Sequence, residues 1–177
     1  MSVRAQPPLN VLIVEDEALL AMDIEAMIED AGHRVVGEAA SLYEVADLAG
    51  DLHPDLAFVD IQLAKGTSGL DVCALIRKRW VDAIVVFVTA NPLKIPADFA
   101  GGHGVIPKPF SRNGLMSAMR YIEEGVCDPP PVSPQPASFI AAPAFAAEWS
   151  QTSRRFPVIT DNRMAARGGT TDDRSST

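Results

Sequence analysis

Short apolar runs alternate with helical patterns along the first 125 residues of the chain. The apolar runs lie at residues 11–14, 34–38, 56–61, 84–88 and 104–106. Four of them are rich in Val, Ile, Leu or Phe and do not alternate strictly with polar residues. Such runs are typical of strands that are covered on both faces, as in a parallel sheet.

Helical patterns fill most of the connections between these runs. They are expected at residues 18–30, from 41 to the turn at 51–54, at 68–80 and at 111–124. The connection at 91–103 contains two prolines and two glycines, so its helix, the fourth, should be short or distorted. Strands that alternate with helices predict an α/β fold with a doubly wound, five-stranded parallel sheet.

The composition limits the classes of function. The chain has 177 residues, a formal net charge of −8 and a pI near 4.8, which disfavours nucleic acid or an anionic membrane as a partner. No apolar run approaches the roughly 20 residues of a transmembrane helix, and the N-terminus lacks the apolar stretch of a secretory signal. We therefore expect a soluble, cytoplasmic protein.

Charge and proline content divide the chain near residue 125. The first 125 residues contain ten basic and 18 acidic side chains, whereas residues 126–177 contain five of each and half of the 14 prolines. We predict an acidic domain at 9–125 and a Pro/Ala-rich tail at 126–177, which is largely disordered or docks through its apolar residues. Those apolar residues include Phe139, Ile140, Phe145 and Trp149. The tail has no helix-turn-helix pattern, and no basic cluster beyond Arg154 and Arg155, so no DNA-binding module is expected.

Acidic side chains follow two strands of the predicted sheet. Glu15 and Asp16 come directly after the first strand, and Asp60 ends the third. In an open α/β sheet, ligands bind beyond the carboxyl ends of the strands. Three carboxylates converging there would repel one another, and a hard divalent cation such as Mg²⁺ would hold them together.

Two further polar residues belong to the same edge. Thr89 follows the fourth strand and Lys108 follows the fifth. A hydroxyl, an ammonium group and a metal that surround one carboxylate make a suitable site for a phosphoryl group. The carboxylate would act as the nucleophile and form an acyl phosphate.

The segments VLIVEDE, LAFVDIQL, VVFVTA and VIPKPF, in this order, resemble the receiver domain of two-component response regulators, the CheY-like family. The resemblance covers about residues 9–125 and implies the flavodoxin-like fold of that family. In receivers, the acidic pair after strand one binds Mg²⁺, and these positions fall on Glu15 and Asp16. The aspartate after strand three accepts a phosphoryl group from a sensor histidine kinase, and this role falls on Asp60.

The resemblance also implies roles for four neighbouring residues. Thr89 would contact the phosphoryl group and couple it to a conformational change, and Lys108 would pair with the phosphoryl oxygens. The backbone carbonyl of Gln62 would complete the metal shell. The peptide bond before Pro109 would be cis.

The sequence departs from the family pattern in three places. Val105 stands where the family often has an aromatic residue whose rotamer reports phosphorylation. The loop after Asp60 has Ala64 in place of a common proline, and its second glycine comes one residue late; this loop type resembles receivers associated with stress and light signalling. The poor fourth helix is the third departure, and together the three should alter the usual output face of helix four, strand five and helix five.

Each candidate residue has a simpler interpretation when it is taken alone. Glu15 and Asp16 would then complement a helix dipole, Lys108 would be a surface lysine, and Thr89 would be a strand-end hydroxyl. Only the complete set indicates a phosphorylation site. The chain's histidines and one cysteine need no such role, because the histidines should be solvated and the cysteine should pack in the core. These residues are His33, His53, His103 and Cys73.

The sequence therefore predicts a single-domain response regulator with a C-terminal extension. It would accept a phosphoryl group on Asp60 and either signal through protein contacts or drain phosphoryl groups from a kinase, without being an enzyme for other substrates. An alternative is a receiver-fold binding module whose output does not depend on phosphorylation. A hydrolase with an aspartate nucleophile would need a second acid/base group and a substrate-capping insertion, and we find neither. The sequence leaves open the kinase, the downstream partner and whether the chain forms a homodimer.

Overall fold

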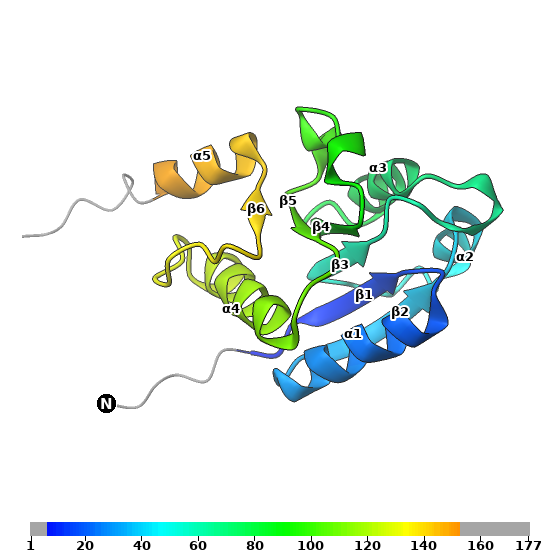
Figure 1. Ribbon diagram of the computed structural model, residues 1–177, viewed down its shortest axis with the longest axis horizontal. Helices are drawn as coiled ribbons and strands as arrows, with labels where there is room; N and C mark the ends of the chain where they lie inside the picture. The colour runs from blue at the N-terminus through cyan, green and yellow to red at the C-terminus, as the bar shows by residue number, and fades with distance from the viewer. Residues whose placement is uncertain (1–6, 153–177) are drawn as a thin grey trace, which may run out of the picture.

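The computed structural model describes residues 7–152, in which five parallel strands follow the five apolar runs. The strands are β1 (Asn10–Val14), β2 (Arg34–Ala39), β3 (Leu56–Val59), β4 (Ile84–Thr89) and β5 (Gly104–Pro107). They lie in the order β2-β1-β3-β4-β5 (Figure 1). The predicted doubly wound sheet is confirmed. Its strand order reverses between β1 and β3, and this is the point where an α/β sheet forms a binding crevice.

Two layers of helices cover the sheet, as predicted from its fully apolar strands. Helices α1 (Ala18–Asp30) and α4 (Arg112–Cys127) pack on one face, and α2 (Leu42–Asp47) and α3 (Gly69–Arg79) on the other (Figure 1). Neighbouring residues of β1 therefore enter different cores, with Ile13 facing α1 and α4, and Leu12 facing α2 and α3. Within residues 7–152, no helix has the length and apolar character needed to cross a bilayer.

The fourth connection contains no α-helix. It consists of two 3₁₀ turns, η2 (Pro92–Lys94) and η3 (Phe99–Gly101), so the prediction of a short or distorted helix is confirmed. Proline lacks the N–H that a helix needs and restricts the residue before it, which explains the break near Pro92 and Pro96. The turn at η3 is left-handed over three consecutive residues, with φ values of 54° at Phe99, 48° at Ala100 and 80° at Gly101.

A sixth strand lies beyond the five that the sequence predicts. Strand β6 (Ile140–Ala141) pairs antiparallel with the outer edge of β5, and helix α5 (Pro143–Thr152) follows it (Figure 1). A two-residue strand carries no recognisable period, so the sequence pattern predicts only the other five strands. Residues 153–177, which include Arg154 and Arg155, lie outside the described residues.

Aromatic side chains hold this segment on the sheet. We call residues 139–149 the cap and residues 128–138, which precede it, the linker. Phe139 is 1% exposed and belongs to the core between α1, α4 and the sheet, while Phe145 and Trp149 are buried in a cluster that includes Tyr121. The burial of each such ring stabilises the fold by about 1.5–3 kcal/mol. The described part of the tail therefore docks on the domain.

Two glycines make room for the cap. A Cβ atom at Gly104 would lie 2.4 Å from the Phe139 ring, and one at Gly125 would lie 2.0 Å from the Trp149 ring. The linker is held in place by Glu124, whose carboxylate accepts hydrogen bonds from the backbone N–H and the hydroxyl of Ser133, both at 2.7 Å. The surface beneath the cap is thus shaped for this segment in particular.

His53 is exposed, as the sequence led us to expect, whereas the other two histidines are partly or fully buried. His33 is buried, so the prediction is wrong for it; its Nδ1 accepts a hydrogen bond from the backbone N–H of Leu9. Burial lowers the pKa of His33, and the nearby carboxylate of Glu123 opposes that effect. His103 is partly buried beside the cap, where its ring meets that of Phe145 edge-on at 5.0 Å. Cys73 is fully buried in the core, as expected.

Substitution of Gly125 by alanine tests the fit of the cap. Alanine favours a helix over glycine by about 1 kcal/mol, but here its Cβ would collide with Trp149. We expect Gly125→Ala to lower the free energy of unfolding by about 1–3 kcal/mol in urea denaturation. In a Trp149→Ala background, the same substitution should become stabilising. A stabilising effect in both backgrounds would contradict the contact.

The protonation of His103 should make the stability of the fold depend on pH. Burial and, to a smaller extent, the charge of Arg77 lower the pKa of His103 from 6.5 to about 4, although the hydrogen bond with the backbone of Val85 opposes them. The unfolded chain therefore takes up this proton at a higher pH than the folded chain, and stability is lost as the pH falls through that interval. We expect this group to account for a loss of about 2 kcal/mol between roughly pH 7 and pH 4.5. Urea denaturation of His103→Gln should show a correspondingly shallower slope, and an unchanged slope would contradict the assignment.

Candidate functional site

The ammonium group of Lys108 joins two acidic residues at the carboxyl edge of the sheet. Its Nζ lies 2.7 Å from Oδ2 of Asp60 and 2.8 Å from Oε2 of Glu15. The Glu15 and Asp60 side chains are 3% and 10% exposed, so both ion pairs are largely shielded from water. The structure thus brings together residues that lie 93 and 48 positions from Lys108 in the sequence.

The sheet itself positions these three residues. The backbone N–H of Glu15 donates to the carbonyl of Ala39, that of Asp60 to Val14, and that of Lys108 to Thr89. Each residue therefore extends the hydrogen-bonding ladder by one step past its strand. Side chains placed in this way are held by the rigid part of the fold, and not by a mobile loop.

The charges at this edge depend on one another. Burial raises the pKa of Glu15, and the hydrogen bond from Lys108 partly opposes that effect. Burial alone would lower the pKa of Lys108, but its hydrogen bonds to Asp60 and Glu15 outweigh burial and raise it. Lys108 therefore remains an ammonium ion, and it partly neutralises the two carboxylates.

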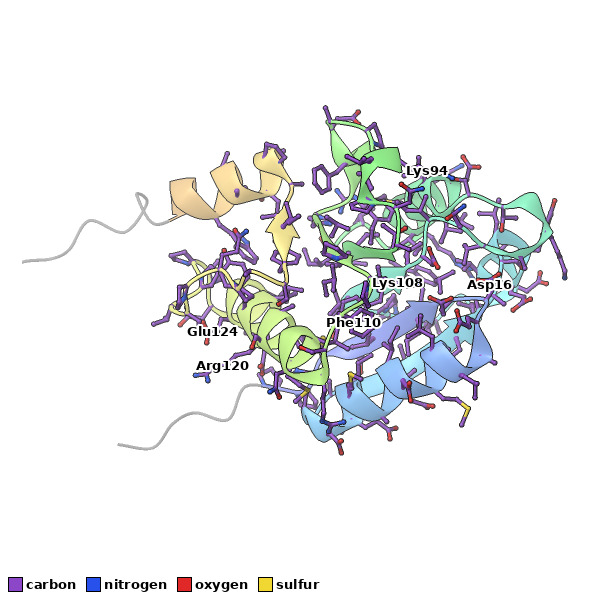
Figure 2. All side chains as sticks on the ribbon, in the orientation of Figure 1. Asp16, Lys94, Lys108, Phe110, Arg120 and Glu124 are labelled. Atoms are coloured by element: carbon purple, nitrogen blue, oxygen red, sulfur yellow. The ribbon has the colours of Figure 1, made fainter. Side chains whose placement is uncertain are left out.

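Asp16 adds a third carboxylate on the solvent side. Glu15, Asp16 and Asp60 each offer a carboxylate oxygen, and these three oxygens lie within 4.8 Å of one another. Asp16 itself is exposed, and Figure 2 shows it at the same end of the sheet as Lys108. Such a group of oxygen ligands, open to solvent on one side, fits a hard cation such as Mg²⁺ that keeps several of its waters.

The surface next to this group is acidic as well. A hollow of about 340 Å³ opens beside Glu15 and Asp16 and extends to Glu38 and Glu44. Burial raises the pKa of Glu38, and the nearby charge of Glu25 adds to that effect. The field of these carboxylates favours a cation over an anionic substrate at this edge.

The other predicted site residues lie at the same edge of the sheet or next to Asp60 and Lys108 in the sequence. Thr89 is fully buried at the end of β4, and its hydroxyl oxygen accepts a hydrogen bond of 3.1 Å from the backbone N–H of Asn91. Gln62 donates its backbone N–H to Oδ1 of Asp60 at 3.0 Å. The peptide bond between Lys108 and Pro109 is cis.

One positioning residue was not predicted from the sequence. Gly69, the first residue of α3, donates its backbone N–H to the carbonyl of Ile61, and a Cβ at Gly69 would lie 2.0 Å from the carbonyl oxygen of Asp60. Only glycine allows the loop after Asp60 to close so tightly. The available signal was the second glycine of that loop, which stands one residue later than in the family pattern.

The comparisons with known proteins agree with this geometry. The family model of the response regulator receiver domain matches residues 11–120. This chain belongs to the receiver domain family. Proteins of this family act as response regulators in signalling, and they generally hold Mg²⁺ in an acidic pocket.

Two curated proteins are similar in sequence to this chain. Phyllosphere-induced regulator PhyR of Methylorubrum extorquens is 45% identical over 84 residues, which is 47% of this chain and 31% of that protein. Transcriptional regulatory protein PdtaR of Mycobacterium tuberculosis is 36% identical over 118 residues, which is 65% of this chain and 57% of that protein. The receiver thus spans less than two thirds of the length of these curated relatives.

A solved structure extends the comparison to the fold. The REC domain of the PhyR response regulator from Erythrobacter litoralis matches with a TM-score of 0.60 and 29% identity. The match covers 71% of this chain and 97% of that domain. The likeness to PhyR therefore appears both in sequence and in structure.

Removal of the Lys108 charge should destabilise the receiver. In Lys108→Met, two buried carboxylates lose their partner, and we expect a loss of about 2–4 kcal/mol in the free energy of unfolding near neutral pH. The loss should shrink as the pH falls, because unpaired buried carboxyl groups take up protons more readily in the folded chain than in the unfolded chain. Urea denaturation at two pH values measures both effects. The matched control is Lys94→Met, because Lys94 is exposed in the 91–103 loop; equal losses in both variants would contradict the assignment.

Proposed function

We propose that Asp60 is the phosphoacceptor of this receiver and that a sensor histidine kinase supplies the phosphoryl group. The observation that carries the proposal is the shared ammonium group of Lys108, which lies within hydrogen-bonding distance of both Asp60 and Glu15. Stability alone does not explain why these three charged residues are present together, because apolar residues of similar volume in place of the whole group would be about as stable. A site that must receive a dianionic group does explain it.

The transfer itself is a simple displacement. A carboxylate oxygen of Asp60 forms a bond to phosphorus while the bond from phosphorus to the histidine nitrogen of the kinase breaks, and that nitrogen retains the electron pair and takes up a proton. Asp60 is held for this step, because its backbone N–H is bonded to Val14 and its Oδ1 to the N–H of Gln62. Little covalent chemistry is left for other residues, so positioning and charge carry the reaction.

Mg²⁺ would be held by Glu15, Asp16, Asp60 and the backbone carbonyl of Gln62, and when bound it would neutralise negative charge on the transferring phosphoryl group. Lys108, directly after β5, supplies the second positive charge. After transfer, the phosphoryl oxygens attract this ammonium group away from the carboxylates. The Thr89 hydroxyl, at the end of the strand between β3 and β5, then donates to a phosphoryl oxygen.

The output of this receiver is proposed to run through protein contacts, or to be the removal of phosphoryl groups from a shared kinase, in the cytoplasm. An output that is independent of phosphorylation is the second candidate, and Val105 is the observation behind it. Val105 is 2% exposed, lies in the core between the sheet and helices α2 and α3, and has no aromatic ring, so it cannot serve as the aromatic reporter that other receivers use. The two candidates differ in whether Mg²⁺ and Asp60 are needed.

Phosphorylation by a small-molecule donor tests the proposal. The purified chain is incubated with Mg²⁺ and phosphoramidate or acetyl phosphate, and the mass of the intact protein is measured. We expect one phosphoryl group on the wild type and none on Asp60→Asn, because the amide is not a nucleophile of this kind; chelation of Mg²⁺ should also prevent the reaction.

The matched control is Asp82→Asn, since Asp82 is an exposed aspartate away from the carboxyl edge and its loss should leave the reaction unchanged. The proposal fails if the wild type gains no phosphoryl group, or if Asp60→Asn gains as much as the wild type. In that case, the binding module that does not use phosphate becomes the better reading of the fold.

A further inference from the structure

The cap covers the edge of β5, and we call the surface beneath it the groove. Val105 pairs with Ile140 and Gly104 with Ala141, and the backbone N–H of Ala142 donates to the carbonyl of His103 at 2.9 Å. The Phe139 ring lies where Gly104 has no side chain. The groove therefore holds a short extended segment by backbone hydrogen bonds and one aromatic ring by shape, which is how a sheet edge binds a peptide.

The groove lies on the strand that carries the site lysine. β5 ends at Pro107, one residue before Lys108, and it pairs on its other side with β4, which ends at Thr89. A shift of Lys108 or Thr89 toward a phosphoryl group therefore acts on the two strands whose outer edge the cap covers. Figure 1 shows the cap and the 91–103 loop side by side beyond this edge, and the packing of Phe99 brings them together.

A chain of contacts links Thr89 to the cap. The Thr89 hydroxyl holds the backbone N–H of Asn91, so the first residues of the loop follow that side chain. At the other end of the loop, Phe99 packs both against the core that contains Phe87 and against the aromatic cluster of the cap. Phe99 is thus an aromatic side chain that contacts both the sheet and the cap. It could link the two, which Val105 cannot do because it has no aromatic ring.

The loop at Phe99 is held in a strained backbone. Phe99 and Ala100 both have positive φ, a region that residues with a side chain rarely adopt. Side-chain packing of Phe99 must maintain this conformation, together with the bond from the Ala100 N–H to the Asp98 carboxylate at 3.0 Å. Loss of the Phe99 packing would therefore remove a contact that opposes relaxation of this backbone.

We propose that phosphorylation of Asp60 releases the cap from the β5 edge, and that the exposed groove then binds an extended, uncharged segment of a partner protein. The inference rests on the proposed function and names its regulation and its partner surface. The pull of the phosphoryl group on Thr89 passes through Asn91 to the loop, Phe99 leaves the aromatic cluster, and the cap loses one wall of its binding site.

The cap itself defines the chemistry of the partner. Residues 137–147 contain no charged side chain, and they present a small residue, an aromatic residue over Gly104, two residues of strand, and a proline that begins a helix. A competing segment must offer an aromatic side chain followed by an extended, apolar stretch. Unpaired backbone groups of β5 then bond to it in place of β6.

Trp149 reports the release directly. The chain has two tryptophans, and the other, Trp80, has a buried Nε1 with no hydrogen-bond partner among the described residues, so Trp80→Phe removes no hydrogen bond. In this full-length variant, phosphoramidate with Mg²⁺ should shift the Trp149 emission to the red and remove its protection from acrylamide quenching. Intact mass, measured on the same sample, gives the extent of phosphorylation.

The two measurements separate the two proposals. If Asp60 is phosphorylated and Trp149 stays protected, the release of the cap is overturned while the proposed function stands. If no phosphoryl group is gained, the proposed function fails and the inference fails with it. Asp60→Asn, added to Trp80→Phe, should show neither change, and a red shift in that variant would overturn the link to Asp60.

Phe99 supplies the test of the coupling route. Phe99→Ala in the Trp80→Phe chain should still be phosphorylated, but Trp149 should give the same emission before and after the reaction. The matched control is Leu93→Ala, because Leu93 lies in the same loop and is 94% exposed; it should respond like the parent. A full Trp149 response in Phe99→Ala would overturn the route through the loop.

A peptide that copies residues 137–149 tests the groove. Fluorescence anisotropy of the labelled peptide should show binding to the phosphorylated full-length chain, and none to Asp60→Asn or to the untreated chain. Replacement of the peptide's Phe139 by alanine should abolish binding. If the phosphorylated chain instead forms dimers and excludes the peptide, the groove takes the cap of a second copy, and the proposed partner is wrong.

Discussion

The ammonium group of Lys108 is the interaction on which the carboxyl edge of the sheet depends. Two buried carboxylates meet there with a third at the surface, and their mutual repulsion would open the edge without a positive charge between them. The parallel order of β1, β3, β4 and β5 brings these residues to one place from distant parts of the chain. The charge arrangement and the sheet topology therefore stabilise each other, and a phosphoryl group enters a site that is already assembled.

The sequence predicted this edge well, because each relevant residue sits one or two positions after an apolar strand. Strand ends fix the direction of such residues, so the convergence of Glu15, Asp60 and Lys108 follows from the alternation of strands and helices alone. The starts of three helices were predictable from a different signal, because Ser41, Ser68 and Ser111 accept backbone hydrogen bonds there as N-caps.

The cap was not predictable in the same way. Its position depends on Gly104 and Gly125, whose missing side chains are filled by Phe139 and Trp149 from far along the chain. No local pattern reveals such pairs, and the proline-rich linker and alanine-rich cap have the composition of a disordered tail. The burial of His33 was not predictable either. Its hydrogen-bond partner is the backbone N–H of Leu9, which lies just before the first strand and far from His33 in the sequence. Tertiary fit decided these features, and local sequence did not.

The placement of the cap also changes what counts as the independent unit of this receiver. The family match ends at residue 120, within α4, whereas the sheet edge is closed only by residues 140 and 141. A segment cut at the family boundary would present β5 as an open edge, with the apolar floor for Phe139 beside it, and such edges template pairing between molecules. For grafting or fusion, the portable module therefore extends through Trp149. Within that module, strand β6 occupies the β5 edge and so prevents it from pairing with another molecule.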